Sequence, residues 1–100
     1  PDEFSPHYEL PSSQLRTLLF EYIDSQGSIS LQNLDMKTQK FDFIERTPSM
    51  RFPDIITVQL FELSADSSTL AIYSRSIEGY GDEARNKNRI KRWIEFISPN

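Results

Sequence analysis

The chain has 100 residues, of which 37% are hydrophobic, and a net charge of −4. This length suits one domain with a single core, and no stretch of eighteen apolar residues is present that would span a membrane. The absence of cysteine and the single histidine, His7, exclude disulfides, thiolate chemistry and the common zinc sites. We therefore expect no cofactor and no metal, and the acidic balance argues against nucleic acid as a partner.

The first eleven residues predict an extended arm. Three of the six prolines lie between Pro1 and Pro11, and proline interrupts regular elements. Phe4 and Tyr8 are expected to pin this arm to the body of the protein. We divide the chain into this arm and one α+β domain over residues 12–100, and expect that a leader or a larger N-terminal portion precedes Pro1.

A helix is predicted to follow the arm and to end before Gly27. Apolar residues recur here at the spacing of a helix with one buried face. Ser12 or Ser13 offers an N-cap oxygen, and Gly27 suits the position after the helix end. The predicted buried stripe comprises Leu15, Leu18, Leu19, Tyr22 and Ile23.

Four strands are predicted in the middle of the chain, because the apolar period changes to two. The first two strands form a hairpin around the polar tip Lys37–Gln39. Within the first strand the alternation slips by one residue near Gln32 and Asn33, which predicts a bulge. The predicted strands cover residues 28–36, 40–47, 55–63 and 69–77.

A second helix is predicted after the strands, with Asp82 as its N-cap. Strands joined without intervening helices form an antiparallel sheet, and two amphipathic helices must cover at least one of its faces. The predicted fold class is therefore α+β: a two-layer, four-stranded, mainly antiparallel sheet with N- and C-terminal helices packed on it, in the order α-β-β-β-β-α. The buried stripe predicted for the second helix comprises Asn86, Ile90, Trp93, Ile94 and Ile97.

Polar residues gather where the fourth strand ends and the second helix begins. Alternation places Ser74 and Ser76 on the helix-covered face, near the first turns of that helix. We favour a structural role, in which an ion pair between Asp82 and Arg89 and the serine hydroxyls lock this corner. The alternative is a site for a small anionic ligand, with hydrolysis as an extension, since helix N-termini and arginine forks both bind oxyanions. The candidate binding residues are Ser74, Ser76, Tyr80, Asp82, Asn86 and Arg89.

No catalytic residue is predicted. A nucleophilic serine needs a positioned base, and the one histidine lies in the terminal arm. Lys87 and Lys91 are expected to be solvated, and no pair of carboxylates has the spacing of an acid and a base. An enzyme is therefore the less favoured interpretation.

Two surfaces are candidates for partner binding. The face of the sheet away from the helices suits a protein partner, or a homodimer formed by sheet packing or edge pairing. Its expected residues are Thr57, Gln59, Phe61, Tyr73 and Arg75. The basic side of the second helix suits anionic lipid headgroups. Its residues are Arg85, Lys87, Arg89, Lys91 and Arg92.

The spacing of the corner residues resembles the domain-of-unknown-function family 1499, a family of bacteria and plants. The residues that match its pattern are Ser74, Ser76, Gly79, Asp82, Asn86 and Arg89. The segments Arg46-Thr47 and Arg51-Phe52-Pro53-Asp54 are similar to its second signature, so the resemblance covers residues 38–97. Ala84 and Arg85 stand where the family commonly has a glycine and a small apolar residue.

The family has no assigned activity, so the resemblance implies a fold unit and not a reaction. Many members are similar in carrying membrane-spanning or export segments upstream. The resemblance therefore implies a domain attached to a membrane or in the cell envelope through a segment absent from this chain. Together with the residues, it leads us to expect a non-catalytic accessory or interaction domain of such a protein.

Overall fold

The structure is a computed structural model that describes residues 3–4, 7–46, 53–76 and 83–97, with the side chains of 7–46, 53–75 and 86–97. It confirms the predicted α+β class. Four antiparallel strands of one sheet follow an N-terminal helix in the sequence and precede a C-terminal helix. A two-residue strand, β1, extends this sheet at one edge. The elements are β1 Glu3–Phe4, α1 Ser12–Ser25, β2 Ile29–Asp35, β3 Lys40–Glu45, β4 Asp54–Ser64, β5 Ser67–Ser76 and α2 Glu83–Ile97.

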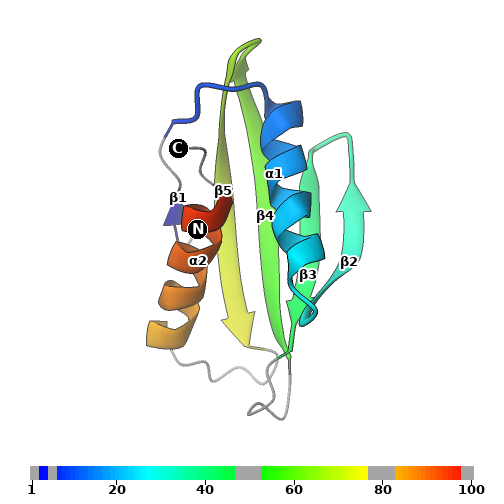
Figure 1. The fold of residues 1–100 in the computed structure, drawn as a ribbon, viewed down its shortest axis with the longest axis vertical. Coiled ribbons are helices and arrows are strands. Elements are labelled where there is room, and N and C mark those ends of the chain that lie inside the picture. Colours follow the sequence, from blue (N-terminus) through cyan, green and yellow to red (C-terminus); the bar gives the residue numbers. More distant parts are fainter. Residues whose placement is uncertain (1–2, 5–6, 47–52, 77–82, 98–100) are drawn as a thin grey trace.

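The strands lie in the order β1-β5-β4-β3-β2, and each pairs antiparallel with its neighbours. Both helices lie on the same face of this sheet, with α1 in front of β4 and α2 in front of β5 (Figure 1). Alternation along the strands directs every second side chain into the layer between sheet and helices. The hydrophobic strand residues buried there are Ile29, Phe41, Phe43, Ile56, Val58, Leu60, Leu70 and Ile72.

The start of α1 differs from the prediction. Its N-cap is Pro11, and no side chain caps the first turn, so the predicted serine cap is wrong. Ser12 lies inside the helix, and its buried hydroxyl accepts a hydrogen bond from the side-chain amide of Gln39 in the turn between β2 and β3. The hydroxyl thus makes a tertiary contact instead of a cap. The helix end agrees with the prediction, because Gly27 follows the C-cap residue Gln26.

The predicted bulge in β2 is present. The register between β2 and β3 shifts between Leu31 and Asn33. This shift restores the phase of the strand, so that Leu31 and Leu34 each lie opposite a buried phenylalanine of β3. Residues directly opposite in a sheet share a face. Both leucines therefore lie on the helix-covered side of the sheet.

The N-terminal arm is attached to β5. Tyr8 is buried in the core, as expected, and its backbone exchanges two hydrogen bonds with Ser68. The fully buried Ser68 hydroxyl donates to the carbonyl of Leu10 at 2.8 Å. These contacts hold the arm against the sheet before α1 begins.

We expect Ser68→Ala to lower the free energy of unfolding by about 1–2 kcal/mol, because the carbonyl of Leu10 loses its donor in a water-poor place. Urea denaturation measures this change. Ser13→Ala, at an exposed serine of α1, is the control and should cause no loss. An equal effect of the two variants would contradict the role of the Ser68 hydroxyl.

Candidate functional site

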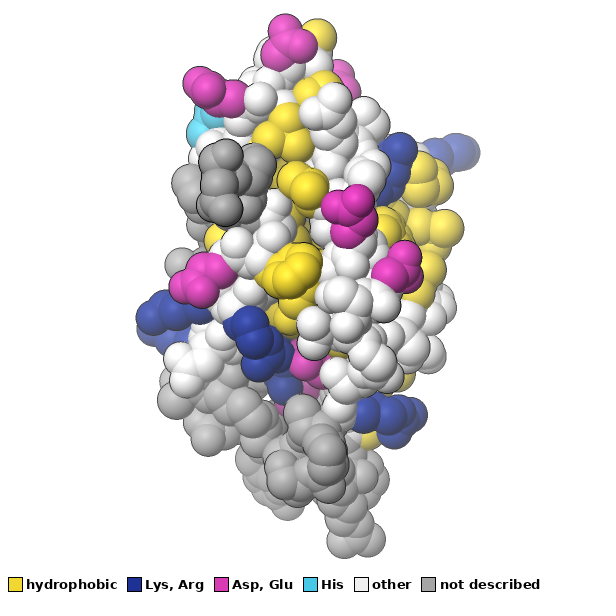
Figure 2. Space-filling model, viewed as in Figure 1, with side chains coloured by type: hydrophobic (Ala, Val, Ile, Leu, Met, Phe, Trp, Pro, Cys, Tyr) yellow, Lys and Arg dark blue, Asp and Glu magenta, His cyan; other side chains and the backbone are white. Residues whose placement is uncertain are grey.

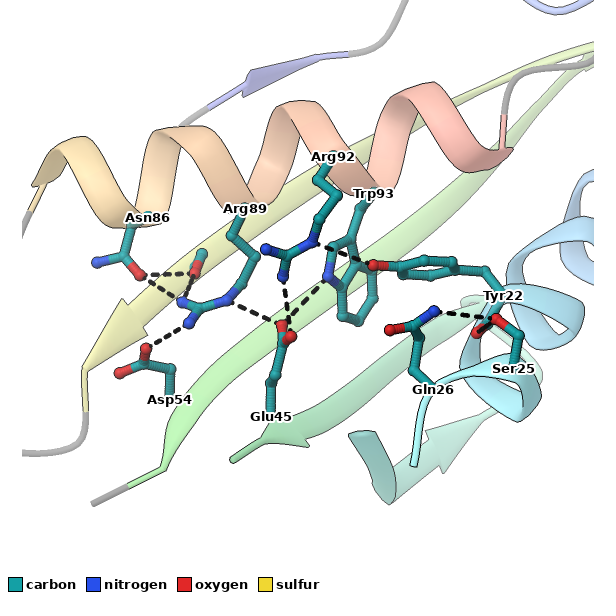
Figure 3. A network of polar contacts seen from close by, with 10 residues as sticks. Tyr22, Ser25, Gln26, Glu45, Asp54, Asn86, Arg89, Arg92 and Trp93 are labelled. Carbon is teal, nitrogen blue, oxygen red and sulfur yellow. Dashed lines mark hydrogen bonds and ion pairs between the residues drawn. The ribbon is translucent and has the colours of Figure 1, made fainter. Parts of the chain in front are cut away.

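Arg89 of α2 lies at the centre of a buried polar cluster (Figure 3). Its side chain is only 3% exposed, although a guanidinium is always charged. Its Nε donates to Glu45 Oε1 at 2.9 Å, and its Nη2 lies 2.7 Å from Asp54 Oδ2. Its Nη1 donates to Ser74 Oγ at 3.0 Å and to Asn86 Oδ1 at 2.8 Å. One guanidinium therefore connects α2 with β3, β4 and β5.

Glu45 is the acceptor that joins most of these groups. Its Oε1 accepts from Arg89 and from Trp93 Nε1, the latter at 3.3 Å, and its Oε2 accepts from Arg92 Nη2 at 2.8 Å. Among the described residues two carboxylates thus face two guanidiniums, and their opposite charges compensate each other, as buried ionic groups require. We refer to these residues as the Arg89 network: Glu45, Asp54, Ser74, Asn86, Arg89, Arg92 and Trp93.

Arg92 closes the outer side of the Arg89 network and is 55% exposed. Its Nε donates to the hydroxyl of Tyr22 on α1 at 3.4 Å (Figure 3). Partial burial by itself lowers the pKa of Arg92, but the hydrogen bond with Tyr22 and the charge of Glu45 outweigh this effect. The pKa of Arg92 is therefore raised, and the side chain stays charged throughout the working pH range.

The two carboxylates reach this place through strand alternation and register. Glu45 continues the buried face of β3, and Asp54 begins the buried face of β4. The register pairs Glu45 directly with Asp54. Like charges in directly opposite positions repel each other. A cation is thus required at this point of the sheet, and Arg89 supplies it.

The structure brings together three of the six candidate residues, Ser74, Asn86 and Arg89. Ser74 Oγ donates to Asn86 Oδ1 at 2.8 Å, and both accept from Arg89. The predicted face of Ser74 is confirmed, since its side chain is buried with those of Leu70 and Ile72. Ser76 ends β5, but its side chain lies outside the described residues, as do Tyr80, Asp82 and Gly79.

Arg89 has two carboxylate partners that the sequence did not suggest. The structure pairs Arg89 with Glu45 and Asp54, while the predicted partner Asp82 lies outside the described residues. Alternation contained the missing signal, because both acids extend apolar strand faces. It could not show that the two acids lie opposite each other, since this depends on the register of distant segments.

The described contacts of the Arg89 network are hydrogen bonds and ion pairs between side chains of the same chain. The contacts described for Ser74 include an amide oxygen and a guanidinium, and neither of these two groups can take a proton from the hydroxyl. Glu45 and Asp54 accept from cations of the same chain. Among the described residues no group of three or more His, Cys, Asp or Glu side chains is arranged to hold a metal ion.

The basic side of α2 is only partly on the surface. Lys87 and Lys91 are exposed, and Arg92 is exposed but paired with Glu45. Arg89 is buried in the Arg89 network, and the side chain of Arg85 lies outside the described residues. Within the described part of the chain no helix is long and apolar enough to cross a membrane.

Comparison of the chain with protein-family models, with curated proteins and with solved structures found no match. The resemblance to the domain-of-unknown-function family 1499 therefore stays a prediction.

Proposed function

We propose that this chain is a non-catalytic interaction domain that binds an extended segment of a protein partner along the outer edge of β2. The observation that carries the proposal is a set of exposed apolar side chains, two on β2 and one, Met36, in the turn that follows it. Leu31, Leu34 and Met36 are 40%, 53% and 50% exposed. We refer to these three residues as the β2 edge patch.

The backbone of β2 supports the same proposal. β2 is the outermost strand of the sheet, and its outer side has no strand partner in the part of the chain that the structure describes. Such an edge presents backbone N–H and C=O groups that can pair with another chain. A partner that adds a strand gains main-chain hydrogen bonds from the edge and specificity from nearby apolar side chains.

The β2 edge patch also borders an apolar part of α1. Phe20 of α1 is half-buried and packs edge-on against Phe41 and Phe43, with ring centroids 5.3 and 5.9 Å apart. Leu31 and Leu34 lie on this same side of the sheet. Figure 2 shows hydrophobic side chains gathered along the margin where β2 lies. An added strand would thus lie beside a surface that accepts apolar side chains.

The Arg89 network supports a function without catalysis. The corner residues that the sequence offered to a small anionic ligand are occupied with internal contacts, as far as the structure describes them. A ligand at Arg89 would have to displace two carboxylates of the chain, at 2.9 and 2.7 Å. The edge of β2 needs no such rearrangement before it binds a partner.

The proposal is tested by incorporating a photo-crosslinking amino acid at Leu34 and irradiating the protein in an extract of its source organism. We expect one discrete adduct, which mass spectrometry identifies as a protein bound through an extended segment. The additional substitution Leu31→Lys should abolish this adduct, because a charge on the edge opposes strand addition. An adduct with a second copy of the chain would show that the partner is the chain itself and that the edge of β2 forms a homodimer.

The matched control is Leu63, which is 54% exposed at the far end of β4. The same crosslinker at Leu63 should give no adduct, or adducts unaffected by Leu31→Lys. The proposal fails if Leu34 gives no adduct, or if both positions capture the same proteins. Capture that survives Leu31→Lys would likewise contradict strand addition.

We also propose, on the resemblance stated above, that the parent protein is membrane-associated or lies in the cell envelope. The exposed cations of α2 are the surface that would face anionic headgroups, at about 1 kcal/mol per basic residue. In sedimentation with vesicles, binding should be stronger to anionic than to neutral lipid and weaker for Lys87→Glu/Lys91→Glu. Equal binding to both kinds of vesicle would contradict lipid recognition by this helix.

A further inference from the structure

A polar cavity of about 230 Å³ lies on the face of the sheet that no helix covers. Residues of three adjacent strands form it, at positions that alternate with the buried core residues. We refer to it as the open-face cavity, and it is lined by Lys40, Thr57, Gln59, Tyr73 and Arg75.

Two cations from opposite sides border the open-face cavity. Lys40 lies on β3 and Arg75 on β5, and both side chains are exposed. Within the described residues neither of them takes part in an ion pair or side-chain hydrogen bond. This distinguishes Arg75 from Arg89 and Arg92, whose charges are used inside the fold.

Asp42, an acid on the same face of the sheet, accepts hydrogen bonds from other side chains of this chain. Thr57 lies on this face as predicted, but it is buried, and its hydroxyl donates to Asp42 Oδ1 at 2.6 Å. Asn33 Nδ2 lies within 3.5 Å of Asp42 Oδ2. Both oxygens of Asp42 thus have donors from the chain. Asp35 lies directly opposite Lys40 in the register of β2 with β3, so two acids accompany the two cations on this face. Neither acid forms an ion pair with Lys40 or Arg75 among the described residues, which leaves the N–H donors of both cations for a ligand.

We propose that the open-face cavity binds a phosphate monoester. Such a group carries nearly two negative charges and three acceptor oxygens. Lys40 lines the cavity from β3, and Arg75 and Tyr73 line it from β5, so a group with three acceptor oxygens suits donors that come from different strands. A planar carboxylate has two oxygens and less charge. The volume left beyond the phosphate admits a small organic group beside the Tyr73 ring.

The test is an NMR titration of the ¹⁵N-labelled chain with glycerol 3-phosphate and, as the neutral control ligand, glycerol. We expect saturable shifts at the amides of Thr57, Gln59 and Tyr73 with the phosphate ester only. Arg75→Gln and Lys40→Gln should each weaken binding about tenfold or more, since each removes a charge-assisted contact. Lys37→Gln, which changes the same charge in the exposed β2–β3 turn, should leave the affinity unchanged.

A second arm distinguishes a soluble ligand from a lipid headgroup, with vesicles of phosphatidylcholine with and without phosphatidic acid. Vesicle binding that needs phosphatidic acid and is lost in Arg75→Gln assigns the phosphate to a lipid. Binding of glycerol 3-phosphate alone assigns it to a soluble metabolite.

The proposal is overturned if neither probe gives a saturable response. It is also overturned if Arg75→Gln and Lys40→Gln bind as the original chain does. Both side chains are exposed, so these variants should keep the fold, which circular dichroism verifies. None of these outcomes bears on the β2 edge patch, because its leucines lie on the other face of the sheet.

Discussion

Replacing Arg89 with methionine should lower the free energy of unfolding by about 3–5 kcal/mol, because removal of one partner leaves buried charges without compensation. Glu45 and Asp54 are 5% and 2% exposed and lie directly opposite each other in the sheet. Without the guanidinium their charges repel in a place that water hardly reaches. Ser74 and Asn86 lose a donor in the same step.

Urea denaturation followed by the fluorescence of Trp93, the single tryptophan, measures this change. Lys87→Met is the matched control, since Lys87 lies on the same helix and is exposed. We expect that control to change stability by less than about 0.5 kcal/mol. A loss below about 1 kcal/mol for Arg89→Met, well short of what breaking a buried pair costs, would refute the structural role of the Arg89 network.

A combined variant tests whether charge is the cause. Adding Glu45→Gln and Asp54→Asn to Arg89→Met removes the repulsion while it keeps the shape of the side chains. The triple variant should therefore be more stable than Arg89→Met alone, since replacing all members of a buried ionic group costs far less than removing one. A triple variant that is less stable than the single one would show that packing, and not charge, dominates at this place.

Trp93→Ala is the second substitution with a large expected effect, a loss of about 3–5 kcal/mol of unfolding free energy. The side chain of Trp93 is fully buried, and its ring packs edge-on against Tyr22 and Phe43 at centroid distances of 5.3 and 5.6 Å. The substitution opens a cavity between α1, α2 and β3. It also removes the indole donor of Glu45.

Because Trp93→Ala removes the fluorescent probe, circular dichroism during urea denaturation is the suitable measurement. Phe96→Ala is the control. The ring of Phe96 also contacts Tyr22, with a centroid distance of 4.6 Å, but the side chain is 54% exposed. It should cost less than about 1 kcal/mol. The prediction is wrong if the two variants lose equal stability. Trp93→Phe should fall between them, because it retains an aromatic ring and loses the indole donor.

The periodicity of apolar residues predicted most of the fold. The helices and long strands each carry one row of apolar side chains, and packing both helices on the sheet buries all these rows together. The third and fourth strands were expected over 55–63 and 69–77 and are found over 54–64 and 67–76. The phase change in β2 located the bulge, because Leu31 and Leu34 share a face only if a residue is inserted. The two-residue β1 carries no periodicity, and its pairing with β5 had no signal in the sequence.

Within the candidate site, the sequence predicted only the contacts between residues that lie close together in the chain. Ser74 lies on β5, and Asn86 and Arg89 lie on α2, the next element along the chain, so alternation and helical spacing suffice to bring them together. Glu45 lies 44 residues before Arg89, and its contact depends on the register of β3 with β4. Local patterns indicate that a buried acid needs a cation. They do not indicate which cation it is.

The position of Arg89 in the chain has a consequence for synthesis on the ribosome. Strands β3, β4 and β5, which carry Glu45, Asp54 and Ser74, precede α2 in the sequence. They therefore leave the ribosome before α2 does. Until Arg89 emerges, closing β3 onto β4 would place two carboxylates opposite each other beside an uncovered apolar face. The nascent sheet should therefore stay open and be a substrate for chaperones. Arrival of the helix then completes the fold in one cooperative step.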